Sequence, residues 1–208
     1  MRRIFSDTLR IRSIGIEVAD RPGGWLLACN HVGHLDPFCL GAVLPRKIGW
    51  MARVEFYRRW WAGSLLSLVH AFPVNRQGVP VSAIKEALNR LARGEVVGVF
   101  SEGEIRMGGE SVLRGAAIKQ GVCLLAVRSE CPVLPCVILG TDKLNAVGPW
   151  LPFHRGRLWI ACGDFIKPVR GTNRRAARAE MARRIEHAFV DLYARLRREC
   201  GLEDSVLP

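Results

Sequence analysis

The chain has 208 residues, of which 49% are hydrophobic and 24% are charged. This length suits one domain with a full core, and this composition excludes a disordered polymer. The formal net charge of +12 indicates a partner with negative charge, which can be nucleic acid, an anionic lipid surface or an acidic small molecule. The seven cysteines lack the paired spacing typical of zinc sites, and we interpret them as reduced core residues.

The amino-terminal segment begins like a signal peptide. Asp7, Arg10 and Arg12 interrupt the apolar stretch of roughly 7–15 residues that such a peptide needs. No window reaches the roughly 18–20 uninterrupted apolar residues of a spanning helix. We therefore expect a cytoplasmic protein whose contact with the membrane is peripheral, at its inner face.

Predicted strands and helices alternate along the chain. Short β-branched or alternating runs predict strands, and longer amphipathic runs predict helices. The expected strands or extended stretches cover 11–18, 25–29 (joined to the first by a turn), 47–52, 72–76, 96–100, 133–139 and 158–162. The expected helices cover 36–44, 54–69, 81–93, 114–127 and 174–198. This order predicts one α/β domain over 1–208, with a mixed, mostly parallel central sheet flanked by helices on both faces.

The first candidate site is the loop that follows the strand at 25–29, from Asn30 to Pro37. Such loops often carry chemistry in α/β proteins. Asp36 can accept a hydrogen bond from one imidazole nitrogen of His31 while the other nitrogen faces a substrate, which is the arrangement of a general base. Two alternatives remain open. Asp36 can be only a helix N-cap beside a hydrogen-bonded loop histidine, or His31, His34 and Asp36 can bind a metal.

Three further segments are candidates for binding. Ser101-Glu102-Gly103 follows a buried strand, and backbone N–H groups there can approach an anion while Arg106 offers a planar fork for phosphate. The extended stretch 72–76 ends in Arg76, which taken alone is a solvated charge. Two tryptophans and two arginines within 58–61 suit a membrane interface, although the aromatic rings suit a core equally well.

Together these motifs resemble the glycerolipid acyltransferase family, in particular the 1-acylglycerol-3-phosphate acyltransferases, over roughly 11–166. The family's first block, Asn-His-x4-Asp-Pro, is matched by Asn30, His31, Asp36 and Pro37. Its other three blocks are approached, in the family's order, by 72–76, 100–106 and the proline-bracketed strand 131–137. The third block departs from the family pattern, with Ser101 in place of Pro, Glu104 in place of Thr and Ile105 in place of Arg. Because of these departures, the sequence is also compatible with an acceptor other than lysophosphatidate.

The resemblance implies a glycerol-3-phosphate acyltransferase-like fold and an enzyme of phospholipid biosynthesis. Such an enzyme transfers a fatty acyl group from acyl-CoA or acyl-carrier-protein to the hydroxyl of a lysophosphatidate-like lysophospholipid at an anionic membrane surface. The resemblance implies that His31 is the base and Asp36 its orienting partner, and that no metal or redox cofactor is required. The implied substrate-binding residues are Arg53, Arg76, Glu102, Gly103 and Arg106.

Two other functions explain less of the sequence. The basic helix that closes the domain, at 172–200, carries an arginine cluster that suits nucleic acid. Nucleic-acid binding leaves the Asn-His-x4-Asp-Pro block unexplained, so we expect no nucleic-acid partner. A hydrolase is chemically closer, but the sequence has no G-x-S-x-G elbow to supply its nucleophile.

Overall fold

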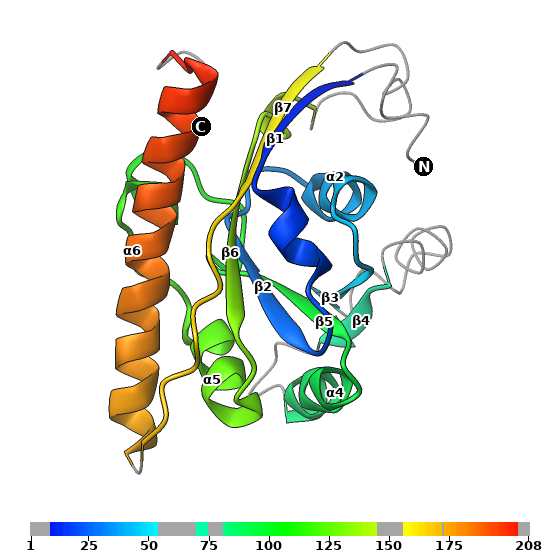
Figure 1. Ribbon diagram of the computed structural model, residues 1–208, viewed down its shortest axis with the longest axis vertical. Coiled ribbons are helices and arrows are strands. Elements are labelled where there is room, and N and C mark those ends of the chain that lie inside the picture. Colours follow the sequence, from blue (N-terminus) through cyan, green and yellow to red (C-terminus); the bar gives the residue numbers. More distant parts are fainter. Residues whose placement is uncertain (1–8, 54–69, 75–80, 145–155, 172, 204–208) are drawn as a thin grey trace.

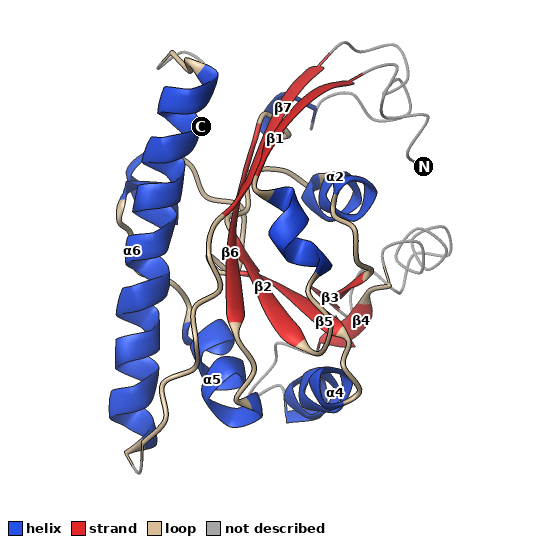
Figure 2. Cartoon of the chain, viewed as in Figure 1, coloured by secondary structure: helices blue, strands red, loops and turns tan. Residues whose placement is uncertain are grey.

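A seven-stranded sheet forms the centre of the computed structural model, which describes residues 9–53, 70–74, 81–144, 156–171 and 173–203 (Figures 1 and 2). The strands are β1 (Leu9–Ile14), β2 (Trp25–Cys29), β3 (Ile48–Arg53), β4 (Phe72–Val74), β5 (Val96–Phe100), β6 (Val133–Leu139) and β7 (Gly156–Cys162). Their order in the sheet is β1-β7-β6-β2-β5-β3-β4. All neighbours are parallel except β6 and β7, which confirms the predicted mixed, mostly parallel sheet.

The strand directions bring several loops to one edge of the sheet. β2, β5 and β6 run in the same direction, so their carboxyl ends lie side by side. We call this the carboxyl edge. Because β7 is antiparallel to β6 and β1 is parallel to β7, the first residues of β1 and β7 also lie at the carboxyl edge.

Helices cover both faces of the sheet. The helices α4 (Val81–Ala92), α5 (Gln120–Ser129) and α6 (Arg174–Cys200) contribute to the core on one face, and α2 (Asp36–Val43) contributes to the core on the other. Strand β2 is buried along its whole length because Leu26 and Ala28 face the first core while Trp25, Leu27 and Cys29 face the second. A continuous apolar run is what a strand covered on both faces requires. No helix among the described residues is both long and apolar enough to cross a membrane.

The first predicted strand is too long. It ends at Ile14, and residues 16–20 form a 3₁₀ helix instead. Gly15 has a left-handed φ of 66°, and a Cβ atom there would lie 2.6 Å from the carbonyl oxygen of Cys162. Only glycine suits both conditions, so the chain leaves the sheet at this residue. The second predicted strand, β2, does not neighbour β1, because β7 and β6 lie between them.

The predicted helix over 114–127 also begins too early. A short 3₁₀ helix, Val112–Arg114, ends at Gly115 with a φ of 89°, and α5 starts only at Gln120. In the intervening segment the backbone N–H of Ile118 donates to Glu186 of α6 at 3.0 Å, which holds the segment against that helix. The last strand begins at Gly156, two residues before the predicted start. The predicted helix over 54–69 lies outside the described residues.

The seven cysteines are all free thiols. Five of them are buried, and Cys131 and Cys200 are partly buried. Burial raises the pKa of Cys39 and of Cys123 to about 12. These two thiols therefore stay protonated at neutral pH, as expected of reduced core residues.

Candidate active site

Two loops meet at the carboxyl edge because their strands are neighbours in the sheet. Cys29, the last residue of β2, lies opposite Phe100, the last residue of β5. The pairing continues past the strands, since the backbone N–H of Ser101 donates to the carbonyl of Cys29 at 2.8 Å and that of Arg106 donates to the carbonyl of His31 at 3.0 Å. The loop after β2 is thereby held against the loop after β5.

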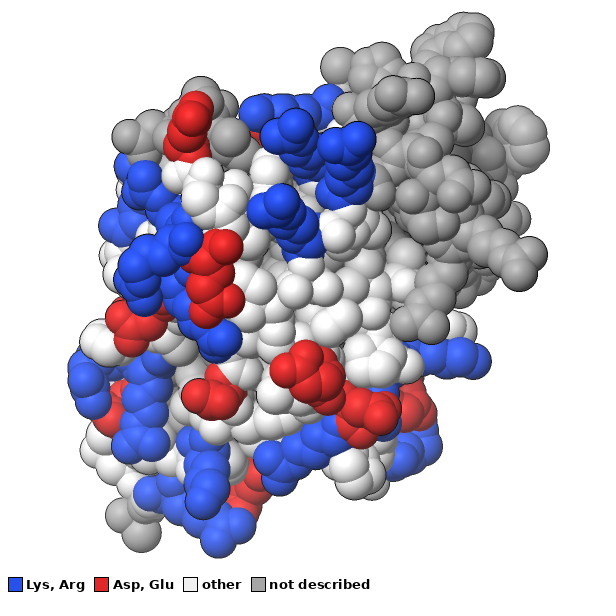
Figure 3. Space-filling view, turned by 45° about the horizontal axis from the view of Figure 1, so that its top comes forward, with Lys and Arg blue, Asp and Glu red and all other residues white. Residues whose placement is uncertain are grey.

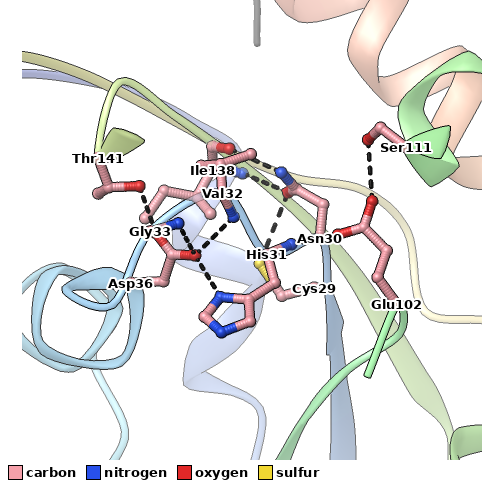
Figure 4. Close-up of polar contacts among 10 residues, drawn as sticks. All are labelled: Cys29, Asn30, His31, Val32, Gly33, Asp36, Glu102, Ser111, Ile138 and Thr141. Atoms are coloured by element: carbon pink, nitrogen blue, oxygen red, sulfur yellow. Dashed lines mark hydrogen bonds and ion pairs between the residues drawn. The ribbon is translucent and has the colours of Figure 1, made fainter. Parts of the chain in front are cut away.

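Asn30 fixes the same loop to β6 on the other side. Its Nδ2 donates to the carbonyl of Ile138 at 2.9 Å, and the N–H of Ile138 donates to its Oδ1 at 2.8 Å (Figure 4). The asparagine side chain thus binds the backbone of β6 as a neighbouring strand would, and both its amide nitrogen and its oxygen have a hydrogen-bond partner. His31 is the next residue, so its backbone position is set from both neighbouring strands.

His31 and Asp36 form a hydrogen-bonded pair in which Nδ1 lies 2.7 Å from Oδ2 (Figure 4). The carboxylate of Asp36 is fully buried. Its Oδ2 also accepts from the N–H of Val32 at 2.9 Å and of Gly33 at 3.1 Å, and its Oδ1 accepts from the hydroxyl of Thr141. A carboxylate surrounded by donors only accepts, so we assign the hydrogen of the neutral imidazole to Nδ1. Nε2 then carries the lone pair, and Figure 4 shows it pointing away from Asp36.

The geometry of Asp36 excludes the interpretation that it is only a helix N-cap. Leu35 is the N-cap residue of α2, whereas Asp36 lies within its first turn and its carboxylate binds groups that precede the helix. Asp36 is therefore a partner of His31 and not an N-cap. In the part of the chain that the structure describes, which includes His31, His34 and Asp36, no group of three or more His, Cys, Asp or Glu side chains is placed to hold a metal ion.

A stack of three aromatic rings supports the imidazole. The ring of His31 lies on that of Phe100 with centroids 4.0 Å apart, and Phe100 lies on Trp50 with centroids 4.6 Å apart. Gly98 makes room for the stack, since a Cβ atom there would lie 2.6 Å from the Trp50 ring. The π face of Phe100 stabilises the ring when it is protonated. The sequence placed Phe100 at the start of the third block without assigning it a role, and Trp50 was missed, although the glycine inside a β-branched strand was a signal of a close approach.

Glu102 binds the backbone of His31 rather than facing the solvent. Its side chain is only 1% exposed. Oε2 accepts from the N–H of His31 at 2.5 Å, and Oε1 accepts from the hydroxyl of Ser111 at 2.9 Å and the N–H of Val112 at 3.0 Å. Burial raises the pKa of the Glu102 carboxyl, and these hydrogen bonds oppose the increase. We therefore revise our expectation that its carboxylate contacts the substrate, because no oxygen of it is left exposed.

The other expected binding residues are placed as follows. Gly103 has a φ of 74°, and its N–H donates to the carbonyl of Phe100 at 3.0 Å. The guanidinium of Arg106 donates from Nη2 to Glu104 at 2.9 Å, whereas its buried Nε has no partner among the described residues. Arg53 ends β3, but its side chain is outside the described part of the structure. Arg76 lies outside the described residues altogether.

The structure thus brings His31, Asp36, Glu102, Gly103 and Arg106 together at the carboxyl edge. Residues 10–139 match the model of the Acyltransferase family, which is more than half of the chain. The chain belongs to this family. The match runs from β1 to the end of β6 and includes every residue of the His31–Asp36 loop.

Two acyltransferases illustrate the similarity. A 1-acyl-sn-glycerol-3-phosphate acyltransferase of Bacillus subtilis (strain 168) is 30% identical over 142 residues, which cover 68% of this chain and 66% of that protein. This chain thus spans just under two thirds of that relative's length. The crystal structure of the 1-acyl-sn-glycerophosphate (LPA) acyltransferase PlsC from Thermotoga maritima superposes with a TM-score of 0.70 at 20% identity, covering 93% of this chain and 76% of that one. The similarity to the Thermotoga maritima structure shows that this chain has the same α/β fold.

Proposed function

We propose that this acyltransferase-family protein moves a fatty acyl group from a thioester donor, acyl-CoA or acyl-carrier-protein, to the hydroxyl of a lysophosphatidate-like lipid. The observation that carries the proposal is the 2.7 Å pair of His31 and Asp36, with Nε2 left as the basic nitrogen. The similarity to the Bacillus subtilis 1-acyl-sn-glycerol-3-phosphate acyltransferase supports the choice of acceptor. A loop histidine with a buried carboxylate partner is the arrangement that general-base catalysis needs.

The reaction needs one group that takes a proton from the acceptor hydroxyl and returns it to the leaving thiolate. Nε2 of His31 takes the proton of the acceptor hydroxyl as the hydroxyl oxygen attacks the thioester carbonyl carbon. Asp36 stabilises the imidazolium that forms, and the ring of Phe100 below it adds to this effect. The tetrahedral intermediate then collapses, the C–S bond breaks, and the imidazolium returns the proton to the departing thiolate. Because only a proton and an acyl group move, we expect no metal or redox cofactor.

In this mechanism Glu102 is a positioning residue. Its carboxylate joins the backbone of His31 to the 3₁₀ helix at Val112–Arg114 and therefore fixes the position of the base at the carboxyl edge. The backbone of Arg106 fixes the same residue from the carbonyl side. Small displacements of a catalytic group lower the rate strongly, so this support contributes to catalysis without touching the substrate.

The acceptor phosphate is proposed to bind beside His31, with Arg106 as its main contact. The buried Nε of Arg106 has no partner among the described residues, and its Nη2 is paired with the exposed Glu104. A phosphate can accept a hydrogen bond from Nε and replace Glu104 as the partner of the guanidinium group. Gly103 keeps the loop backbone close to the same place, and Arg53 and Arg76 remain proposed contributors.

Arg106→Ala is expected to raise the apparent KM for a phosphorylated acceptor by about 10- to 100-fold, the loss of a charge-assisted hydrogen bond of about 1.5–3 kcal/mol. The KM for the acyl donor should change much less. The measurement is steady-state transfer with each substrate varied in turn. Arg128→Ala, which removes an exposed arginine from α5, is the control and should leave both KM values unchanged. Equal increases in both KM values for Arg106→Ala would contradict the assignment.

We further propose that the protein works peripherally at the inner, cytoplasmic face of an anionic membrane. Its charge of +12 and the lipid acceptor both favour this location. Binding to such a surface should weaken as the salt concentration rises.

The proposed activity is tested with purified protein, labelled acyl-CoA or acyl-carrier-protein, and a panel of lysolipids that differ in head group. We expect transfer to lysophosphatidate, identified by mass spectrometry of the product. Transfer to a different lysolipid would keep the acyltransferase mechanism and replace the acceptor. Absence of transfer from either donor to every acceptor would overturn the proposed function.

A further inference from the structure

Three exposed arginines line a hollow at the carboxyl edge, beside the end of α6. Arg10 and Arg12 lie on β1 and Arg157 lies on β7. The hollow has a volume of about 400 Å³ and is closed by Trp159 and by residues 200–203, which end and follow α6. Figure 3 shows basic side chains gathered over this end of the molecule. None of these arginines belongs to the His31–Asp36 site.

The three arginines differ from several other arginines of the described residues in their ion pairing. Many other arginines pair with a carboxylate, as Arg90 does with Glu86 at 2.7 Å and Arg184 with Glu180 at 2.7 Å. Among the described residues, no carboxylate forms an ion pair with Arg10, Arg12 or Arg157. Glu203 lines the hollow but is in no such pair. Three uncompensated positive charges therefore face one hollow.

The register of the sheet makes this arrangement costly without an anion. Arg10 lies directly opposite Arg157, and Arg12 lies opposite Trp159 two residues further on. Side chains two apart on a strand share a face, so the three guanidinium groups project from the same face of the sheet. Neighbouring strands are about 4.8 Å apart, and like charges placed opposite one another destabilise the pairing. An anion between the guanidinium groups converts this repulsion into attraction.

Strand β7, which carries Arg157, is the sheet neighbour of β6, whose end borders the candidate active site. Thr141, whose hydroxyl donates to Asp36, follows Gly140. Gly140 packs so closely on β7 that a Cβ atom there would lie 2.2 Å from the carbonyl oxygen of Arg157. Arg157 thus lies one strand away from the end of β6, where Thr141 holds the Asp36 carboxylate, and Arg10 and Arg12 lie one strand further on, at the same edge of the sheet.

We propose that Arg10, Arg12 and Arg157 form a phosphate-binding site separate from the acceptor site at His31. Guanidinium forks match phosphate oxygens in pairs, and three of them on one face of the sheet can surround one phosphate group. That phosphate belongs either to a lipid head group of the membrane surface or to a soluble phosphate ester. The site needs only binding and does not depend on the proposed acyl transfer.

The first test uses inorganic phosphate and thermal unfolding. Phosphate should raise the Tm of the wild-type protein above its value in chloride at equal ionic strength, because it binds only the folded state. The double variant Arg10→Gln/Arg157→Gln should lose this increase. Its Tm in chloride should be equal to or above that of the wild type, since the repulsion is gone. Arg174→Gln/Arg175→Gln removes the same charge from exposed positions of α6 and should respond to phosphate like the wild type.

The second test uses vesicles, with no acyl donor or acceptor present. Sedimentation with phosphatidylcholine vesicles is compared with sedimentation with vesicles that contain 30% phosphatidylglycerol. If the phosphate is that of a lipid, Arg10→Gln/Arg157→Gln should bind the anionic vesicles about 30-fold more weakly, the loss of about 1 kcal/mol for each basic side chain. The α6 double variant should lose less.

The two tests distinguish a lipid phosphate from a soluble phosphate ester, and they can also show that there is no binding site. A variant effect on vesicles alone indicates lipid head groups, and a variant effect on inorganic phosphate indicates soluble phosphate esters. If the double variant equals the α6 control in both tests, the site does not exist. Should the double variant fail to fold, Arg10→Gln alone, which removes one of the two opposed charges, replaces it in both measurements.

Discussion

Replacing His31 by alanine is expected to lower kcat for acyl transfer by about 10²- to 10⁴-fold, the usual contribution of a general base. The fold should survive. The backbone N–H of His31 donates to Glu102 and its carbonyl accepts from Arg106, and neither bond involves the ring. The ring itself is partly exposed, with 17% of the side chain accessible. The loss is therefore chemical and not structural.

The measurement is kcat with saturating donor and acceptor, together with circular dichroism and Tm to verify folding. The chain provides a matched control on its surface. His187 and Asp191 of α6 form a pair at 2.9 Å with the same chemistry as His31 and Asp36, but both side chains are mostly exposed. His187→Ala should leave kcat unchanged. A folded His31→Ala variant with undiminished transfer would contradict the role of His31.

Asp36→Asn is expected to lower kcat by about 10²- to 10⁴-fold, because the neutral amide no longer stabilises the imidazolium. Stability should change little, by at most about 2 kcal/mol. An asparagine oxygen can still accept from the N–H groups of Val32 and Gly33, and its amide can donate to the hydroxyl of Thr141. The measurement pairs kcat with urea unfolding, and Asp191→Asn on the surface is the control.

Asp36→Ala separates this chemical role from the structural one. It leaves the same buried donors without an acceptor, so the free energy of unfolding should fall by about 3–5 kcal/mol, as when one partner of a buried pair is removed. Equal stability losses for Asp36→Asn and Asp36→Ala would show that the charge itself holds the loop. Unchanged kcat in Asp36→Asn would remove Asp36 from the mechanism.

Local patterns were sufficient for most of the fold. The β-branched run at Val96–Phe100 and the apolar run at Val133–Leu139 were predicted to the residue, because buried parallel strands need continuous apolar sequence. Two of the errors, the end of the first strand and the start of the helix predicted over 114–127, fell at glycines. Gly15 and Gly115 adopt left-handed φ values that depend on what the chain meets in three dimensions, and a one-dimensional pattern does not contain that information.

The candidate site was predicted unevenly for a similar reason. His31 and Asp36 are five residues apart, so a loop motif was enough to pair them. Thr141 binds the same carboxylate from 105 positions away, and only the sheet order brings it there. Glu102 was identified, but its carboxylate points to the backbone of His31 because β2 and β5 are neighbours. The catalytic motif is thus local in the sequence, whereas the residues that hold it in place come from distant parts of the chain.

The arginines of β1 and β7 show the same limit. In the sequence, Arg10 and Arg12 only interrupt an apolar segment and alternate as strand residues do. Their meaning as a cluster depends on Arg157, which the parallel pairing of β1 with β7 places opposite Arg10. A charge cluster across strands is visible only once the register is known.

Direct acyl transfer by the His31–Asp36 pair is tested most directly in a single turnover, with protein in excess over a donor labelled in its acyl chain. The mechanism predicts that the label passes from the thioester to lysophosphatidate, that it does so only when the acceptor is present, and that intact-protein mass spectrometry finds no acylated protein at any time. His31→Ala should leave the label on the donor. Label that accumulates on the protein, or that appears as free fatty acid at the same rate without acceptor, would contradict the mechanism.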